Sequence, residues 1–150
     1  MDRIRRALRG PGEDQLDRAA AAIRSMACHY TGVYLYRLED GELVLRGFAG
    51  RPSPHTRIPV GTGICGRAVA ERRDILVPDV GQGDRYLACN LETRAELVVL
   101  VEHDGRPVGE IDIDSDLLDP FTPQDLARLR EAARLLAPHL AHAGHALAAS

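Results

Sequence analysis

Cysteine is scarce in this sequence, which holds only Cys28, Cys65 and Cys89. An odd and sparse set argues against a framework of structural disulfides and leaves a redox or nucleophilic thiol open. The chain also lacks a run of about 18 apolar residues, which excludes a transmembrane helix. No apolar stretch of the signal-peptide kind follows the N-terminal arginines. We therefore expect a cytoplasmic protein with no membrane partner.

A large net charge is absent as well. The formal net charge is −3, which gives no electrostatic reason to expect nucleic acid or an anionic membrane as a partner. Positive charge gathers at Arg3, Arg5, Arg6 and Arg9 without interleaved aromatic residues, and we interpret this cluster as a solvated chain end. With 45% hydrophobic and 27% charged residues, the chain is expected to form a single globular domain over residues 1–150.

Apolar residues at helical spacing predict a helix over about residues 13–27 and a second over about 123–140, with Thr122 as its N-cap. Pro138 could break or kink the second helix, and Cys28 is expected to belong to the core beside the first. Alternating patterns and turn signals predict the elements between them: strands at 31–38, 43–48, 75–77, 96–102 and 107–114, and a short helix from 64 to 72 or 73. This order favours an α+β fold, with the terminal helices on one face of a central antiparallel sheet and a loop-covered ligand pocket on the other.

Three carboxylates fall on one face of the last predicted strand. Glu110, Asp112 and Asp114 alternate with two isoleucines, and side chains alternate between the faces of a strand. The face is either washed by solvent, or it is a floor that binds a cationic or amino group, or a source of protons for a reaction. Crowding would raise the pKa of at least one carboxyl group. Glu96, at the start of the neighbouring strand, could join this set.

Two cysteines stand in contexts that suit chemistry. Cys65 lies in the glycine-rich residues 61–66 and is either a small buried thiol beside a turn or a functional group. No Gly-Lys-Ser/Thr ending follows it, so a phosphate loop is not expected. Cys89 lies in a long polar loop over residues 78–93, where exposed thiols tend to be reactive. The six histidines form no convincing ligand set, so we expect no metal ion and no bound cofactor.

Four segments together resemble one family of enzymes. They are Arg57-Ile-Pro-Val-Gly-Thr-Gly-Ile-Cys-Gly, the step Ala88-Cys89, Glu96-Leu-Val, and Gly109-Glu-Ile-Asp-Ile-Asp-Ser. They resemble the free methionine-(R)-sulfoxide reductases, which are GAF-domain enzymes, and the resemblance runs from about residue 30 to residue 121. Spacing makes it specific. Cys65 and Cys89 are 24 residues apart, as two cysteines of that family are, and the acidic trio of the family corresponds to Glu96, Asp112 and Asp114.

The resemblance implies a thiol mechanism acting on free L-methionine-R-sulfoxide. Cys89 would be the nucleophile that attacks the sulfoxide sulfur, while a carboxylic acid among Glu96, Asp112 and Asp114 protonates the departing oxygen. A sulfenic acid would remain on Cys89. A second thiol, Cys65 or an external one, would form a disulfide that the thioredoxin and NADPH system reduces. The acidic trio would also bind the ammonium group of the free amino acid.

Two departures from the family pattern keep a second function open. His55 stands where the family usually has a third cysteine, often the resolving one. Tyr30 stands where the family has a tryptophan at the pocket, and this chain has no tryptophan. The alternative function is a non-catalytic GAF module that senses a small ligand or the redox state. In either case, apolar stripes on the terminal helices predict a homodimer.

Overall fold

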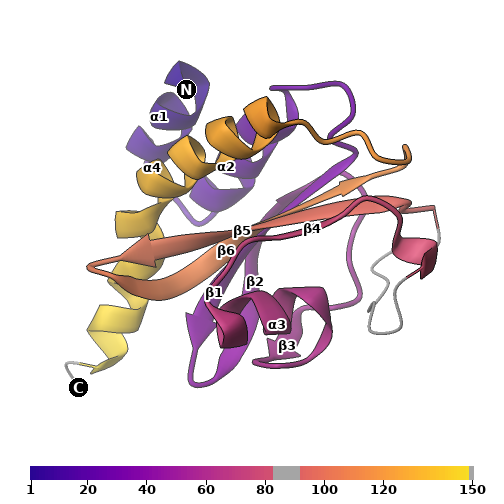
Figure 1. The fold of residues 1–150 in the computed structure, drawn as a ribbon. Coiled ribbons are helices and arrows are strands. Elements are labelled where there is room, and N and C mark those ends of the chain that lie inside the picture. Colours follow the sequence, from indigo (N-terminus) through magenta and orange to yellow (C-terminus); the bar gives the residue numbers. More distant parts are fainter. Residues whose placement is uncertain (83–91, 149–150) are drawn as a thin grey trace.

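The computed structural model describes residues 1–82 and 92–148. A single antiparallel sheet has the strand order β3-β2-β1-β6-β5-β4. Helices α1, α2 and α4 lie on one side of this sheet and α3 lies on the other (Figure 1). In chain order the elements are α1 (Asp2–Arg9), α2 (Gln15–Arg24), β1 (Gly32–Glu39), β2 (Glu42–Ala49), β3 (Arg57–Pro59), α3 (Gly63–Glu71), β4 (Ile75–Val77), the 3-10 helix η1 (Val80–Gln82), β5 (Ala95–His103), β6 (Arg106–Ser115) and α4 (Pro123–Ala148). The predicted α+β architecture is confirmed.

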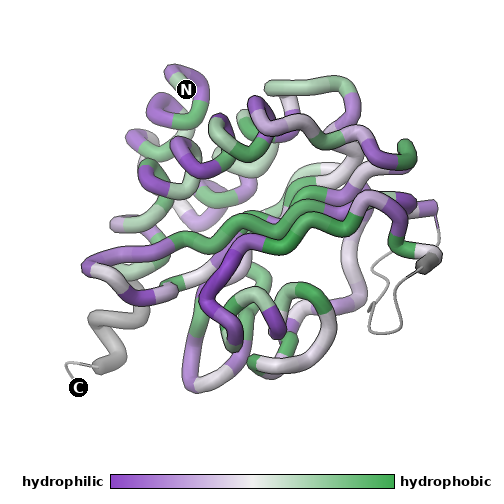
Figure 2. The backbone as a smooth tube through the Cα atoms, viewed as in Figure 1, coloured by the Kyte–Doolittle hydropathy of each residue, from purple (hydrophilic) through white to green (hydrophobic). Residues whose placement is uncertain are grey.

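The strands carry two separate apolar clusters, one on each face. Ile111 and Ile113 pack with the helices α1, α2 and α4. Tyr34, Tyr36 and Val98 pack with α3 on the opposite face. Apolar residues run along the central strands between the two helix layers (Figure 2). The polar and charged residues of β6 must therefore share the face that α3 covers.

One glycine sets how closely α2 lies against the sheet. A Cβ atom at Gly47 would lie 2.5 Å from the carbonyl carbon of Leu16, closer than real side chains come. Only glycine fits at this position of β2 without moving the helix. Asp17, the next residue of α2, accepts a hydrogen bond of 2.9 Å from the backbone N–H of Phe48. Helix and strand are thus joined by contact and by a hydrogen bond.

The first core helix is shorter than the periodicity predicts, and this corrects the placement of Cys28. Helix α2 ends at Arg24, not near residue 27. Cys28 lies in the turn that leads to β1 and is exposed, so the prediction that it belongs to the core is wrong. The chain must reverse there to enter the sheet, and this carries Cys28 away from the apolar side of the helix.

The N-terminal arginines are exposed, as expected of a solvated chain end, but the segment that carries them is a helix docked on the core. They lie on helix α1, whose Ile4 and Leu8 are buried against the core. Residues four apart share one helix face, so two apolar side chains are enough to dock this helix while its arginines face outward. The sequence signal is weak because arginine dominates the segment.

The last helix continues through Pro138, so the break that this proline could have caused does not occur. Proline removes one backbone donor and crowds the preceding turn, which normally disfavours a helix interior. Here Leu136, Ala137 and Leu140 are all buried, so packing holds the chain helical on both sides of the proline.

Within the part of the chain that the structure describes, none of the helices combines the length and the apolar character that a membrane span requires.

Candidate functional site

Four carboxyl groups gather where β5 pairs with β6. Glu96 lies directly opposite Asp114 in the register, and Glu110 and Asp112 follow at two-residue steps along β6 on the same face. Their exposed fractions are 2% for Glu96, 0% for Glu110 and Asp112, and 1% for Asp114. The face is therefore not washed by solvent, and that interpretation of the carboxylates is wrong. Asp and Glu are almost never fully buried unless paired, so this cluster points to a site.

The glycine-rich turn before α3 places the Cys65 thiol over these carboxylates. A Cβ atom at Gly66 would lie 2.6 Å from the Pro59 carbonyl oxygen, so glycine is needed where the turn closes on itself. The backbone N–H of Gly61 also donates to the carbonyl of Gly66 at 2.9 Å. This compact turn starts a helix that lies on the sheet, and the side chain of Cys65 points into the sheet with 5% of its surface exposed.

The thiol contacts two of the predicted acids. Cys65 Sγ lies 3.4 Å from Asp112 Oδ2 and 3.8 Å from Glu96 Oε1. Sγ and the two carboxylate groups each offer one ligand atom, and the three atoms all lie within 4.8 Å of one another. The structure thus brings together four of the predicted site residues: Cys65, Glu96, Asp112 and Asp114.

Burial sets the protonation of the cluster. Removal from water raises the pKa of Asp112 to about 6, and raises the pKa of Glu110 well above its usual range. Burial, followed by the neighbouring charge of Asp112, likewise raises the pKa of Asp114. The pKa of the Cys65 thiol is raised for the same reasons, by burial first and then by the acids around it. The site therefore retains protons near neutral pH, and Cys65 is a thiol that donates to carboxylates, not a thiolate.

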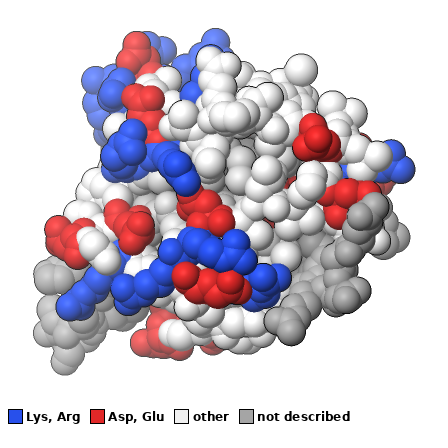
Figure 3. All heavy atoms as spheres, viewed as in Figure 1, with Lys and Arg blue, Asp and Glu red and all other residues white. Residues whose placement is uncertain are grey.

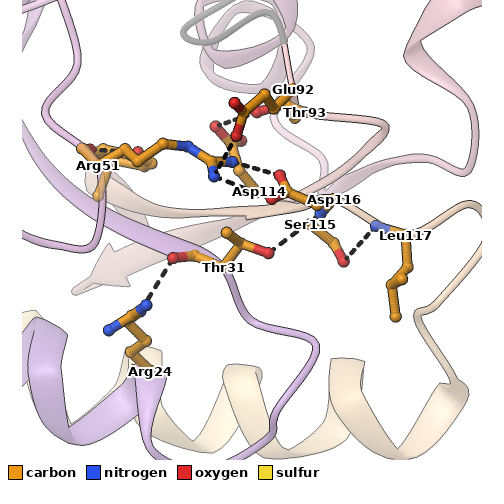
Figure 4. Close-up of polar contacts among 10 residues, drawn as sticks. Arg24, Thr31, Arg51, Glu92, Thr93, Asp114, Ser115, Asp116 and Leu117 are labelled. Carbon is orange, nitrogen blue, oxygen red and sulfur yellow. Dashed lines mark hydrogen bonds and ion pairs between the residues drawn. The ribbon is translucent and has the colours of Figure 1, made fainter.

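An arginine that sequence analysis missed stands at the edge of the cluster. Arg51, in the loop after β2, pairs with Asp116 and donates to Glu92 Oε2 at 2.9 Å (Figure 4). Thr93 Oγ1 donates to Asp114 Oδ2 at 3.4 Å in the same view. Thr93 and Arg51 both lower the pKa of Asp114, against the dominant effect of burial. A lone loop arginine carries no sequence signal of this role.

Two tyrosines border the carboxylates on the neighbouring strand β1. Tyr34 lies opposite Asp112 and Tyr36 lies opposite Glu110 in the pairing of β1 with β6. Their hydroxyl groups donate to the carbonyls of Arg51 and His55, at 2.7 and 2.8 Å. The sequence places residues 34 and 36 on one face of their strand. That they share this face of the sheet with the acids follows only from the register.

The structure does not bring Tyr30 together with the acids. Its ring belongs to the apolar cluster on the helix side of the sheet. Its hydroxyl group donates to Asp125 Oδ1 at 2.7 Å, in the first turn of α4. Asp125 also accepts from the backbone N–H of Thr122 at 2.8 Å, which confirms Thr122 and Asp125 as a capping pair. Cys89, the predicted nucleophile, lies outside the described residues.

The outer surface contrasts with the buried site. On the face drawn in Figure 3, arginines and acidic residues are interspersed, with no large area of a single sign. This agrees with the small net charge of −3. Carboxyl groups without interspersed arginines are instead gathered inside, between α3 and the sheet.

Comparison with known proteins finds a family and several relatives. The GAF domain model matches residues 13–140. Protein YtsP of Bacillus subtilis is 34% identical over 137 residues, which cover 86% of this chain and 83% of that protein. Free methionine-R-sulfoxide reductase of Escherichia coli is 38% identical over 103 residues, covering 69% of this chain and 61% of that protein. The solved type II free methionine-R-sulfoxide reductase of Thermoplasma acidophilum aligns with a TM-score of 0.81 at 38% identity, over 84% of this chain and 89% of that one.

Proposed function

This chain belongs to the GAF domain family, and on that premise we propose that it reduces free L-methionine-R-sulfoxide to methionine. The observation that carries the proposal is the contact of a buried thiol, Cys65, with the acids Glu96 and Asp112. The similarity to two named reductases at 38% identity supports the same activity. The chain spans 61% of the Escherichia coli enzyme, so this activity is proposed for the domain described here.

The acids have two tasks in this proposal. Glu96 and Asp114, which lie opposite each other across β5 and β6, would bind the ammonium group of the substrate, whose positive charge would favour their ionised forms over the effect of burial. A methionine sulfoxide within a peptide lacks that ammonium group and would leave the buried charges without a partner, so the site selects the free amino acid. Asp112, whose pKa is raised to about 6, can hold a proton and act as the acid.

The chemical step would use Cys89 as the nucleophile. Its thiolate attacks the sulfoxide sulfur and the S–O bond breaks. The protonated carboxyl group donates its proton to the departing oxygen, which ends on Cys89 as a sulfenic acid. The substrate sulfur is reduced by two electrons, and the sulfur of Cys89 is oxidised by two. General acid catalysis of this kind contributes about 10²–10⁴-fold.

Recycling would follow from a second thiol. Cys65 attacks the sulfenic sulfur of Cys89, water leaves, and thioredoxin reduces the resulting disulfide with electrons from NADPH. Because burial raises the pKa of Cys65, a neighbouring carboxylate must take its proton first. An external thiol is the other route, since His55 stands at the position of the family's usual third cysteine. Substitution Cys65→Ser separates the routes, because it blocks multiple turnovers only if Cys65 resolves the sulfenic acid.

The test is NADPH consumption in a thioredoxin-coupled assay. Free methionine-R-sulfoxide should be consumed, while the S epimer and a peptide-bound sulfoxide should not. Cys89→Ser should abolish turnover, and Cys28→Ser, which removes an exposed thiol, should leave it intact. Absence of R-specific turnover by folded, fully reduced protein would refute the proposal.

A sensor is the second candidate function, and the protonated state of Cys65 favours it. A buried thiol with a raised pKa is a slow nucleophile. Such a thiol suits a residue that contacts a ligand better than one that reacts with it. A sensor would bind free methionine sulfoxide or another small amino compound without consuming it. In calorimetry, the Cys89→Ser chain would then bind the ligand with the same affinity as the wild-type chain. Neither protein would consume the ligand.

A further inference from the structure

We propose that Cys65, Glu96 and Asp112 form a site for a thiophilic divalent cation, Zn²⁺ above all, in the reduced protein. The three side chains come from α3, β5 and β6, and their buried donor atoms all lie within 4.8 Å of one another. The inference does not depend on the proposed reductase activity, although it uses some of the same side chains.

The distances between the donor atoms match zinc coordination. Bonds of about 2.3 Å to sulfur and about 2.1 Å to oxygen in a tetrahedral site hold the sulfur and oxygen about 3.6 Å apart. Cys65 Sγ lies 3.4 Å from Asp112 Oδ2 and 3.8 Å from Glu96 Oε1. Both sulfur–oxygen distances are thus close to those of a zinc site, and binding also needs the loss of the thiol proton.

Unpartnered oxygen atoms show that the cluster has unused ligand capacity. Both carboxylate oxygens of Glu110, and Oδ1 of Asp112, are buried without a well-formed hydrogen bond from any described residue. Glu110 is fully buried and interacts with the Cys65 thiol, so its carboxyl group lies beside the same donor atoms. A buried polar atom without a partner is costly. A cation among these groups would satisfy them and offset their mutual repulsion.

The donor set selects the metal class. One thiolate with carboxylates suits zinc or cobalt, whereas magnesium and calcium take oxygen ligands alone. Magnesium also keeps several waters of its own, which donors this deeply buried do not favour. We therefore expect zinc to bind far more tightly than magnesium, and the site to exclude calcium.

Zinc and an amino-acid ligand would compete for Glu96 and Asp112. If the proposed reductase activity is present, zinc should inhibit it and a chelator should restore it. Linkage is reciprocal, so free methionine sulfoxide should weaken zinc binding by the same factor. A reduced chain with its thiol on zinc would also be protected from oxidation at Cys65.

The test uses Co²⁺ as a spectroscopic probe and needs no sulfoxide. In the Cys28→Ser/Cys89→Ser chain, Cys65 is the remaining cysteine, so a thiolate-to-cobalt absorption band can come from it alone. We expect that band, and we expect added zinc to abolish it. Competition with a coloured chelator then measures the zinc affinity. Absence of the band in this folded double variant would overturn the proposal.

Further variants locate the ligands. Adding Asp112→Asn should weaken zinc binding by about 10–100-fold, and Cys65→Ser should remove the cobalt band. Glu102→Gln, an exposed charge on the same strand β5, is the matched control and should bind like its parent. Equal weakening by Glu102→Gln and Asp112→Asn would also overturn the site, since it would show a general charge effect. Circular dichroism confirms the fold of each variant.

Because the readout is metal binding, the two proposals can fail separately. Cobalt binding without sulfoxide reduction would support the site and refute the enzyme. Sulfoxide reduction without a cobalt band would support the enzyme and refute the metal site.

Discussion

Cys65 Sγ lies 3.4 Å from Asp112 Oδ2, and this contact connects α3 to a central strand of the sheet. The charge of Asp112 is, after burial, the largest cause of the raised pKa of Cys65. In a chain with Cys28→Ser and Cys89→Ser, Asp112→Asn should therefore lower the pKa of Cys65, although burial keeps it above the usual value. The rate of alkylation against pH measures it. The same pKa in Glu102→Gln is the expected control result, and an unchanged pKa in Asp112→Asn would contradict the account.

The buried acids should make the protein less stable as pH rises. Burial raises the pKa of Asp112 from 3.8 to about 6, so over this window the folded state binds more protons than the unfolded state. The stabilising proton is fully present below pH 4 or so and is lost as pH rises through about 6. Asp112→Asn removes this loss. The difference in unfolding free energy between the variant and the wild type should therefore shift by about 1–3 kcal/mol in favour of the variant as pH rises from about 5 to about 8. Urea unfolding at both pH values measures this shift. A shift in favour of the wild type as pH rises would contradict the assignment.

Arg51 should tune the proton affinity of Asp114. Its positive charge lowers the pKa of Asp114, so Arg51→Ala should raise that pKa further, while Arg51→Lys should have a smaller effect. Carbon NMR titration of the aspartate side chains follows the pKa directly. Arg57→Ala, at an exposed position on β3, is the matched control. A lower pKa of Asp114 in Arg51→Ala would show that the arginine acts in another way.

Tyr30 should matter for stability and not for ligand binding. Tyr30→Phe removes the 2.7 Å hydrogen bond to Asp125, and a bond to a charged group contributes about 1.5–3 kcal/mol. Thermal unfolding should show that loss, with KM or Kd for the ligand unchanged. Tyr34→Phe, on the face of the carboxylates, should change the ligand constant instead. A large change in ligand affinity for Tyr30→Phe would restore this residue to the pocket.

The sheet and the acidic face could be predicted because both follow from the period of two in a strand. Alternation alone placed Glu110, Asp112 and Asp114 on one face. Their burial could not be predicted, because it depends on α3 folding across that face, which is a long-range contact. Similarly, two apolar residues among arginines did not reveal α1, whose docking against α2 and α4 is also a long-range contact.

The position of Tyr30 shows a different limit. Its assignment to the pocket came from resemblance, and the partner that fixes its side chain, Asp125, is 95 residues away in sequence. Arg51 likewise meets Asp116 only after the strands have paired. Cytoplasmic location, the homodimer and reduction by thioredoxin stay predictions.

The central claim is tested most directly by a single turnover without any reductant. Fully reduced chain is mixed with free methionine-R-sulfoxide, and the methionine formed is measured by chromatography. The account predicts about one methionine per wild-type chain, the same from Cys65→Ser, and none from Cys89→Ser. No methionine from the reduced wild-type chain, or equal amounts from the R and S epimers, would contradict it.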